Sequence, residues 1–215
     1  MTDLGKTEIT KLTSELPLRT QAFINGAFTE AIAGRKFESI NPATGELICA
    51  VSHCHGEDID NAVKAARASF EDGIWSRSAP ENRKEVLLKL AELVRCHAGV
   101  LSVMESIDSG KTITDCHQEI SVEVASCFQW YAELIDKRFG KVASTGEEAL
   151  ALIVKEPIGV VGMITPWNWP INQISCKVGP AIAAGCTMIL KPTEIAPLNA
   201  ILLAEVLHEA GLPKG

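Results

Sequence analysis

Two short apolar runs, each followed by a helix-forming segment, dominate the last third of the sequence. The runs Ile158–Ile164 and Cys186–Leu190 are almost continuously apolar, as buried strands of a parallel sheet usually are. The segments 171–184 and 199–210 have helical spacings of apolar residues. Since a β-α-β-α order folds with right-handed crossovers, the sequence predicts a parallel sheet and an α/β fold.

The first two thirds predict a small β layer followed by helices. β-type runs bounded by turn residues cover 22–25, 36–40 and 47–52. Helical patterns cover 58–70, a run that begins near Pro80, about 99–108 and about 115–137. Ser78 and Glu81 fit a capping box at the start of the second of these helices. We expect residues 1–20 to form a loose arm, and the alternation in 141–156 predicts a β-hairpin.

The composition excludes several classes of protein. The 215 residues include 27 acidic and 20 basic side chains, a formal net charge of −7, which argues against general nucleic-acid binding. No apolar run approaches the ~18 residues that a membrane-spanning helix needs, and the polar start of the chain does not resemble a signal peptide. Seven irregularly spaced cysteines do not form a disulfide framework. We therefore expect a cytoplasmic protein with free thiols and no membrane partner.

Polar residues follow both predicted strands, at the edge where an open parallel sheet binds its ligands. Asn168 stands between two tryptophans and two prolines, so its amide is a stiffly held donor of the kind that an oxyanion needs. Lys191 and Glu194 form a donor and acceptor that could grip the hydroxyls of a ribose. The alternative is that Asn168 caps the following helix and that Lys191 and Glu194 are a surface pair; both interpretations stay open.

Other reactive side chains give weaker indications. Cys49, His53, Cys54 and His55 are crowded together without the spacing of a standard zinc site. Cys186 is expected in the core. Cys176 could face a cleft, but no histidine lies near it in the sequence to activate it, so we interpret it as an inert thiol.

Glu119 and Glu123 lie one helical turn apart. They indicate either a solvated helix face or an acidic rim that attracts a cationic substrate. The glycine-rich loops that commonly hold phosphates, G-x-G-x-x-G and G-x-x-x-x-G-K-[ST], do not occur in the sequence.

Several motifs occur together in the order typical of one enzyme family. They are Phe-Ile-Asn-Gly at 23–26, Asn-Pro-Ala-Thr-Gly at 41–45, Asp-Ser-Gly-Lys at 108–111, Thr-Pro-Trp-Asn-Trp-Pro at 165–170, Lys-Val-Gly-Pro-Ala at 177–181, Ala-Gly-Cys-Thr at 184–187 and Lys-Pro-Thr-Glu at 191–194. The chain resembles the amino-terminal part of the NAD(P)-dependent aldehyde dehydrogenases over nearly its whole length. Among them it is most similar to the γ-glutamyl-γ-aminobutyraldehyde and related aminoaldehyde dehydrogenases.

The resemblance implies roles for individual residues. Asn168 would supply the side-chain donor of the oxyanion hole. NAD, with NADP as a possibility, would be bound by Ile164, Thr165, Pro166, Trp167, Lys191, Thr193 and Glu194. The aldehyde tunnel would be lined by Glu119, Glu123, Trp169, Gln173, Cys176 and Lys177, where Cys176 stands in place of an aromatic residue that many relatives carry. The Asp108 carboxylate and the Ile40 carbonyl resemble a monovalent cation site of some members; no other metal is expected.

The resemblance also implies a domain organisation. Residues 1–20 would be an N-terminal arm, 21–138 and 158–215 the amino-terminal part of the cofactor-binding domain, and 139–157 a hairpin of the oligomerisation domain. The fold would be the start of a parallel Rossmann-like sheet with flanking helices, a small N-terminal β layer and a protruding hairpin. In this family the nucleophilic cysteine and the general-base glutamate come later, so the catalytic domain would be absent and the chain truncated.

Two functions follow as hypotheses. The first is an enzyme whose complete form is a homo-oligomer that oxidises a small aldehyde, with an aminoaldehyde or a γ-glutamyl-aminoaldehyde as the expected substrate. The second is a non-catalytic chain that binds nucleotide weakly or acts as an interaction module through the hairpin at 139–157.

Overall fold

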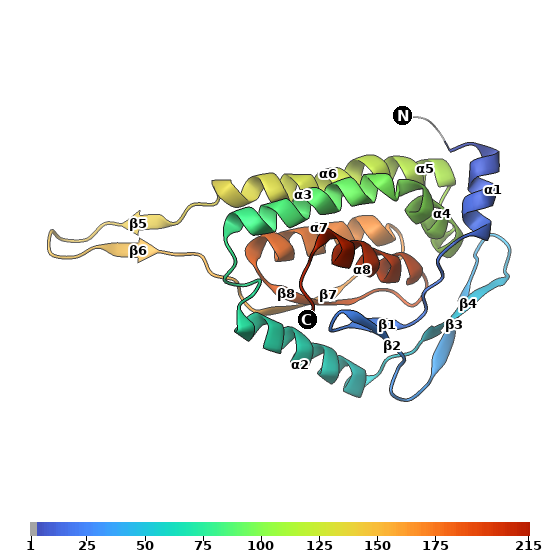
Figure 1. Cartoon of the computed structure of the whole chain (residues 1–215), viewed down its shortest axis with the longest axis horizontal. Coiled ribbons are helices and arrows are strands. Elements are labelled where there is room, and N and C mark those ends of the chain that lie inside the picture. The colour runs from blue at the N-terminus through green and yellow to red at the C-terminus, as the bar shows by residue number, and fades with distance from the viewer. Residues whose placement is uncertain (1–3) are drawn as a thin grey trace.

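The computed structural model describes residues 4–215, which form stacked layers of helices and strands beside a projecting hairpin (Figure 1). Two parallel strands, β7 (Val160–Ile164) and β8 (Thr187–Lys191), lie in the middle. Helix α2 (Gly56–Asp72) covers one face of these strands and α7 (Pro170–Ala184) the other. The predicted parallel β-α-β unit is therefore confirmed.

The register of the two strands aligns their carboxyl ends. Val160 is the partner of Thr187, and Ile164 is the partner of Lys191. Only Met163 of β7 is buried, whereas Ile164 is 74% exposed. The prediction of a fully buried strand at 158–164 is thus wrong for this chain, because β7 pairs with β8 alone among residues 4–215.

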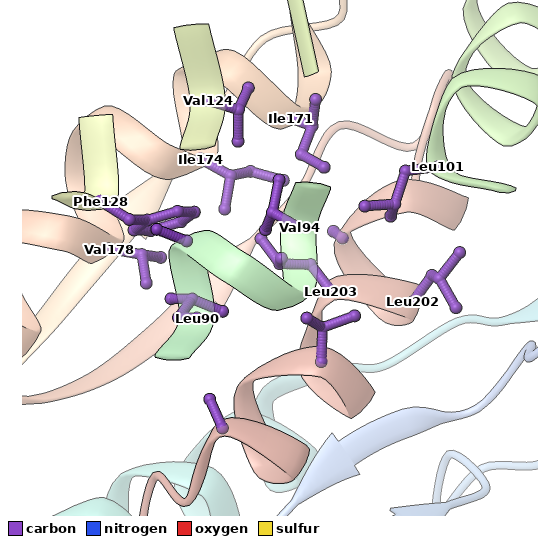
Figure 2. Close-up of a cluster of buried hydrophobic side chains, with 14 of the residues drawn as sticks. Leu90, Val94, Leu101, Val124, Phe128, Ile171, Ile174, Val178, Leu202 and Leu203 are labelled. Atoms are coloured by element: carbon purple, nitrogen blue, oxygen red, sulfur yellow. The ribbon is translucent and has the colours of Figure 1, made fainter. Parts of the chain in front are cut away.

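Helices α3 (Pro80–Cys96) and α6 (Ala125–Leu134) pack as an outer pair over α7. Between them and the later helix α8 (Leu198–Ala210) lies the main core (Figure 2). Its largest fully buried side chains come from α3, the helical region at 98–137, α7 and α8, and they include Phe128, Leu87, Leu90, Leu101, Met104, Ile120, Ile171, Ile174, Ile182, Leu198 and Leu203.

The helical region at 98–137 is divided by a change of helix type. Helix α4 (Ala98–Ser109) ends at Gly110, whose φ of 77° favours glycine. The long helix expected from about 115 consists of α5 (Ile113–Gln118), the π-helix η1 (Glu119–Val124), α6 and the 3₁₀ turn η2 (Ile135–Lys137). A π-helical segment inside an α-helix often marks a functional site, and the apolar spacing gave no sign of it.

Three further small sheets are two-stranded and antiparallel. The pairs are β1 (Ala22–Ile24) with β2 (Ala27–Thr29), β3 (Lys36–Ile40) with β4 (Leu47–Ser52), and β5 (Lys141–Ala143) with β6 (Ala151–Ile153). The last pair is the predicted hairpin, and it projects from the body of the molecule (Figure 1). The sequence missed β2, which is only three residues long.

Two local predictions were wrong. Residues 4–20 are not uniformly loose, because helix α1 (Lys6–Ser14) packs against α4; residues 1–3 lie outside the described part. The capping box at Ser78 does not form: Ala79 is the N-cap of α3 and makes no side-chain cap. Ser78 Oγ instead donates to the Trp75 carbonyl at 2.7 Å. The expected proline in the first turn, Pro80, is present.

Candidate cofactor and aldehyde site

The two polar segments predicted from the sequence begin at the same level of the sheet. Ile164 and Lys191 are register partners, and Thr165 N donates to Lys191 O at 3.3 Å. Thr165–Pro170 therefore leaves β7 beside the point where Lys191–Glu194 leaves β8. This is the carboxyl edge of the strands, where open α/β sheets bind ligands.

Asn168 lies free at this edge. It is exposed, as are its neighbours Trp167 and Trp169. Its side chain makes no hydrogen bond within residues 4–215, and the N-cap of α7 is Trp169, which has no side-chain cap. The helix-cap interpretation of Asn168 is therefore wrong.

Lys191 and Glu194 form the predicted pair. Lys191 Nζ lies 3.0 Å from Glu194 Oε2, and both side chains are more than half exposed. Hydrogen bonds from its own backbone and from the Lys191 ammonium lower the pKa of the Glu194 carboxyl. The pair thus presents an ionised acceptor beside a cationic donor, which suits the two hydroxyls of a ribose. Thr193 between them is buried, and its Oγ1 accepts from Ile195 N.

A mainly apolar cavity of about 720 Å³ lies along β8. It is lined by β1, α2, all five residues of β8, α8 and the segment 212–215, and it reaches Lys191, Thr193 and Glu194. Within the described residues β8 pairs only with β7, so one wall of the cavity is an open strand edge. Its volume is within the ordinary range for a small-molecule site.

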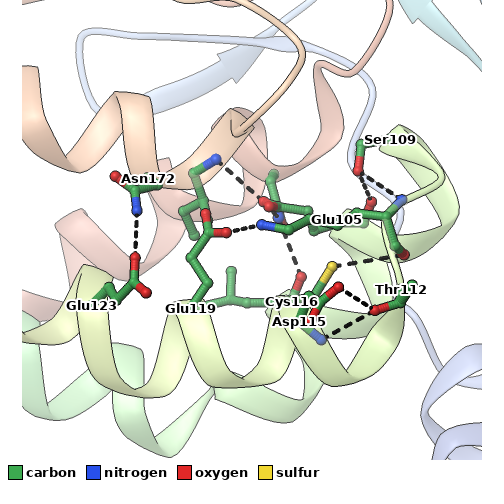
Figure 3. A network of polar contacts seen from close by, with 12 residues as sticks. Glu105, Ser109, Thr112, Asp115, Cys116, Glu119, Glu123 and Asn172 are labelled. Carbon is green, nitrogen blue, oxygen red and sulfur yellow. Dashed lines mark hydrogen bonds and ion pairs between the residues drawn. The ribbon is translucent and has the colours of Figure 1, made fainter.

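The carboxylates of α4 contact the helices that follow the two segments, and Figure 3 shows one of them, Glu105. Glu105 is fully buried, and its Oε2 accepts from Ile171 N at 3.2 Å and from Asn199 Nδ2 at 2.8 Å. Glu105 therefore joins the first turns of α7 and α8, the two helices that follow the site segments. Burial raises the pKa of Glu105, while the hydrogen bonds from Asn199 and Ile171 oppose that rise.

Asp108, one turn further along α4, completes this arrangement. Its Oδ2 accepts from Leu198 N at 2.7 Å and its Oδ1 from Ser39 Oγ at 2.9 Å. Burial raises the pKa of the Asp108 carboxyl to about 6. Both oxygens are engaged by protein donors, so Asp108 acts here as a link between β3 and α8. A monovalent cation bound by Asp108 and the Ile40 carbonyl stays a prediction. Within residues 4–215 no group of three metal-ligating side chains could hold a metal ion.

Glu119 does not lie on a solvated face. Its side chain is buried in η1 and forms an ion pair with Lys111 (Figure 3). The Lys111 ammonium also lies 5.7 Å from the centre of the Trp169 ring. The interpretation of Glu119 and Glu123 as one acidic rim is therefore wrong for Glu119. Glu123 is exposed, and its Oε2 accepts from Asn172 Nδ2 at 3.1 Å.

The remaining predicted tunnel residues lie along α7. Lys177 Nζ lies 3.3 Å from Gln173 Oε1, and both side chains are half-buried. Cys186 is buried, as expected, and Cys176 is exposed. The roles of these residues toward an aldehyde stay predictions.

The sequence interpretation missed Glu105, Lys111 as the partner of Glu119, and Asn199. The sequence did hold one signal: Glu105 and Asp108 are acidic residues one turn apart in the segment 98–108, where most of the other residues are apolar. Charged side chains in such a stretch are buried only when they are paired or hydrogen-bonded.

Comparison with known proteins agrees with this geometry. The profile of the aldehyde dehydrogenase family matches residues 28–215, so the chain belongs to the aldehyde dehydrogenase family. It is 46% identical to the aminoacetaldehyde dehydrogenase of Pseudomonas aeruginosa over 99% of this chain and 43% of that protein. It is 45% identical to the NADP/NAD-dependent aldehyde dehydrogenase PuuC of Escherichia coli over 93% of this chain and 40% of that protein.

Solved structures give the same result. The indole-3-acetaldehyde dehydrogenase AldA of P. syringae, solved with NAD⁺, superposes with a TM-score of 0.94 at 38% identity, over 97% of this chain and 42% of that one. The fold is thus the amino-terminal part of the aldehyde dehydrogenase fold. The chain spans about two fifths of the length of these relatives. Within residues 4–215, no helix has the length and apolar character needed to cross a bilayer.

Proposed function

We propose that the complete protein containing this chain oxidises an aldehyde to a carboxylic acid, with a nicotinamide cofactor as hydride acceptor. The observation that carries the proposal is the pairing of Ile164 with Lys191. It brings the segment of Asn168 and the Lys191–Glu194 pair to one edge of the sheet. Membership of the aldehyde dehydrogenase family supports the reaction class.

Within this chain, Asn168 donates its amide N–H to the oxyanion that forms when the aldehyde carbonyl is attacked. An exposed amide without an internal partner is free to accept that role, and desolvation by the bound reactants would strengthen the hydrogen bond. Glu105 and Asp108 are positioning residues, because they hold the helices that follow the two site segments.

The cofactor is NAD⁺ in preference to NADP⁺. Lys191 and Glu194 grip the adenosine ribose, with Thr193 between them, and Ile164, Thr165, Pro166 and Trp167 border the path of the cofactor. The exposed donor and acceptor, 3.0 Å apart, fit a vicinal diol. An ionised Glu194 would repel a 2′-phosphate. The named cofactors of PuuC and the NAD⁺ bound in AldA support a nicotinamide dinucleotide.

The substrate is an aminoaldehyde or a γ-glutamyl-aminoaldehyde. The name of the Pseudomonas aeruginosa relative supports this class. Glu123 supplies an exposed negative charge beside Asn172 on α7, and such a charge attracts a cationic substrate. Glu119 is neutralised by Lys111 and does not contribute.

The nucleophilic cysteine and the general base are supplied by sequence outside these 215 residues. Burial raises the pKa of Cys116 to about 12, and a thiol with a raised pKa is a poor nucleophile at neutral pH. On this proposal, the 215-residue chain by itself is inactive as a dehydrogenase.

The complete protein is a homo-oligomer joined in part by the hairpin β5–β6. The hairpin exposes Val142, Leu152 and Val154, each at least 61% accessible. A two-stranded hairpin is marginally stable alone, so it gains stability by adding to the sheet of another subunit.

The proposal is tested by expressing the complete protein and following reduction of NAD⁺ with a series of aldehydes and aminoaldehydes. We expect oxidation in wild type and in Asn61→Ala, a control on the exposed face of α2, and strong loss in Asn168→Ala. Absence of NAD⁺ and NADP⁺ reduction with every aldehyde would contradict the proposal and favour a non-catalytic nucleotide-binding or interaction module.

A further inference from the structure

Helix α7 packs beside α6 and beside η1, which leads directly into α6, and two contacts define which residues face each other. Asn172 Nδ2 donates to Glu123 Oε2 at 3.1 Å (Figure 3). Further along both helices, a Cβ on Gly179 would lie 2.8 Å from Cδ2 of Tyr131. The absence of a side chain at Gly179 thus lets the Tyr131 ring approach the α7 backbone closely.

Cys127 and Cys176 occupy the positions between these two contacts. Cys127 lies four residues after Glu123 and four before Tyr131, while Cys176 lies four residues after Asn172. Residues three or four apart share one face of a helix. The two thiols are therefore brought together at the interface of α6 and α7.

The electrostatic surroundings agree with this placement. The pKa of the Tyr131 hydroxyl is raised by burial and then by both thiols, Cys127 and Cys176. The neighbouring Cys176 thiol also contributes to the raised pKa of Cys127, after burial. Both thiols are therefore near enough to the Tyr131 hydroxyl to affect its pKa.

The two cysteines differ in access. Cys176 is exposed, with its Sγ 3.6 Å from Asn172 Oδ1, whereas Cys127 is half-buried. An exposed thiol meets a soluble oxidant first, and a nearby protected thiol is suited to resolve the product.

We propose that Cys127 and Cys176 form a reversible intramolecular disulfide that joins α6 to α7 when the protein meets hydrogen peroxide. In the first step the Cys176 thiolate attacks peroxide: an S–O bond forms, the O–O bond breaks and hydroxide leaves, giving a sulfenic acid. In the second step Cys127 attacks that sulfur: the S–S bond forms, the S–O bond breaks and water leaves. Two thiols lose two electrons, and one peroxide is reduced to two waters.

Formation of this disulfide needs neither an aldehyde nor a nicotinamide cofactor, so it is tested by mass. The complete protein is treated with hydrogen peroxide, its remaining thiols are alkylated, and it is digested with trypsin and a glutamate-specific protease without reductant. Cleavage after Glu119 and Glu123 separates Cys127 from Cys116, which a tryptic digest alone would leave in one peptide.

We expect one linked pair, the peptides 124–133 and 156–177, which dithiothreitol separates; trypsin cuts after Lys155, and the bond between Glu156 and Pro157 resists cleavage. Cys127→Ser should abolish the link and leave Cys176 as a sulfenic or sulfinic acid. Cys96→Ser, which removes an exposed thiol on α3, should not change the link. Treatment in concentrated urea should scatter the disulfides among the cysteines.

Three results would overturn the proposal. The first is oxidation of Cys176 in the wild-type protein to a sulfenic or sulfinic acid without a disulfide, as expected for Cys127→Ser. Another is Cys176 linked to Cys96 or another cysteine in the native protein. The third is a link that forms equally in urea, because the pairing would then owe nothing to the packing of α6 against α7.

Discussion

Asn168 is exposed and makes no internal hydrogen bond within the described residues, so its side chain is not needed to hold the fold. We predict that Asn168→Ala in the complete protein lowers turnover about 10²–10³-fold, the usual loss for one oxyanion-hole donor. Turnover is compared with that of Asn61→Ala, and circular dichroism checks the fold. Equal turnover in Asn168→Ala and wild type would remove the catalytic role.

Glu194 is the second residue whose role is decided by a single substitution. Its pKa is lowered, so it is charged at neutral pH and opposes a 2′-phosphate. We predict that Glu194→Gln raises kcat/KM for NADP⁺ relative to NAD⁺. Wild-type enzyme that already prefers NADP⁺, or a variant with an unchanged preference, would show that Glu194 does not read the ribose. Glu92→Gln, on the exposed face of α3, is the matched control.

Asp108 predicts a pH dependence of stability. Its pKa rises from 3.8 to about 6 on folding, chiefly through burial. Between these values the unfolded chain loses the proton while the folded protein keeps it, so folding is favoured by protonation. This contribution is fully present below pH 3.8 and is lost as the pH rises through about 6. We expect the melting temperature of wild type, relative to Asp108→Asn, to fall over this range. A constant difference would show that the carboxyl titrates normally.

At the scale of elements, the sequence predicted what local patterns determine. Apolar spacing located α2, α3, α7 and α8, and Gly110, Gly185 and Gly211 marked helix ends in the left-handed conformation. Turn residues around 144–146 separated the two strands of the hairpin. The β-α-β-α order of apolar runs and helical segments was enough to predict the parallel pairing of β7 with β8.

What the sequence could not predict depends on tertiary neighbours. The sequence around Glu119 is compatible with a solvated residue, because no local pattern predicts its ion pair with Lys111. Ser78 fits a capping box, but its hydroxyl bonds the Trp75 carbonyl instead. The same holds for Glu105, whose partners Ile171 and Asn199 are distant in the chain. In each case a polar partner from another element decides the outcome.

At the scale of the whole molecule, apolar surface is left uncovered by residues 4–215. Ile158 is 88% exposed and Ile164 74%, β8 has an open edge, and the hairpin stands apart from the body (Figure 1). Open edges and apolar patches favour association. We predict that the 215-residue chain expressed alone aggregates or self-associates and reduces no NAD⁺. The prediction is checked by sedimentation analysis and by a thermal melt. A single monomeric species that melts cooperatively would contradict it.

The two carboxylates of α4 also bear on how the molecule folds over time. They join groups 66 to 94 residues apart, and contacts that close such long loops form late. Substitution of a late contact mainly accelerates unfolding. Glu105→Ala should therefore unfold faster in urea than wild type, whereas the control Glu92→Ala should unfold at the wild-type rate. Both rates are followed by tryptophan fluorescence. An unchanged unfolding rate with slower refolding in Glu105→Ala would instead place Glu105 in the folding nucleus. The last step of folding would then be the one that fixes Asn168 and Lys191 in place, so a newly made chain would acquire its ligand site only when the rest of this region is already assembled.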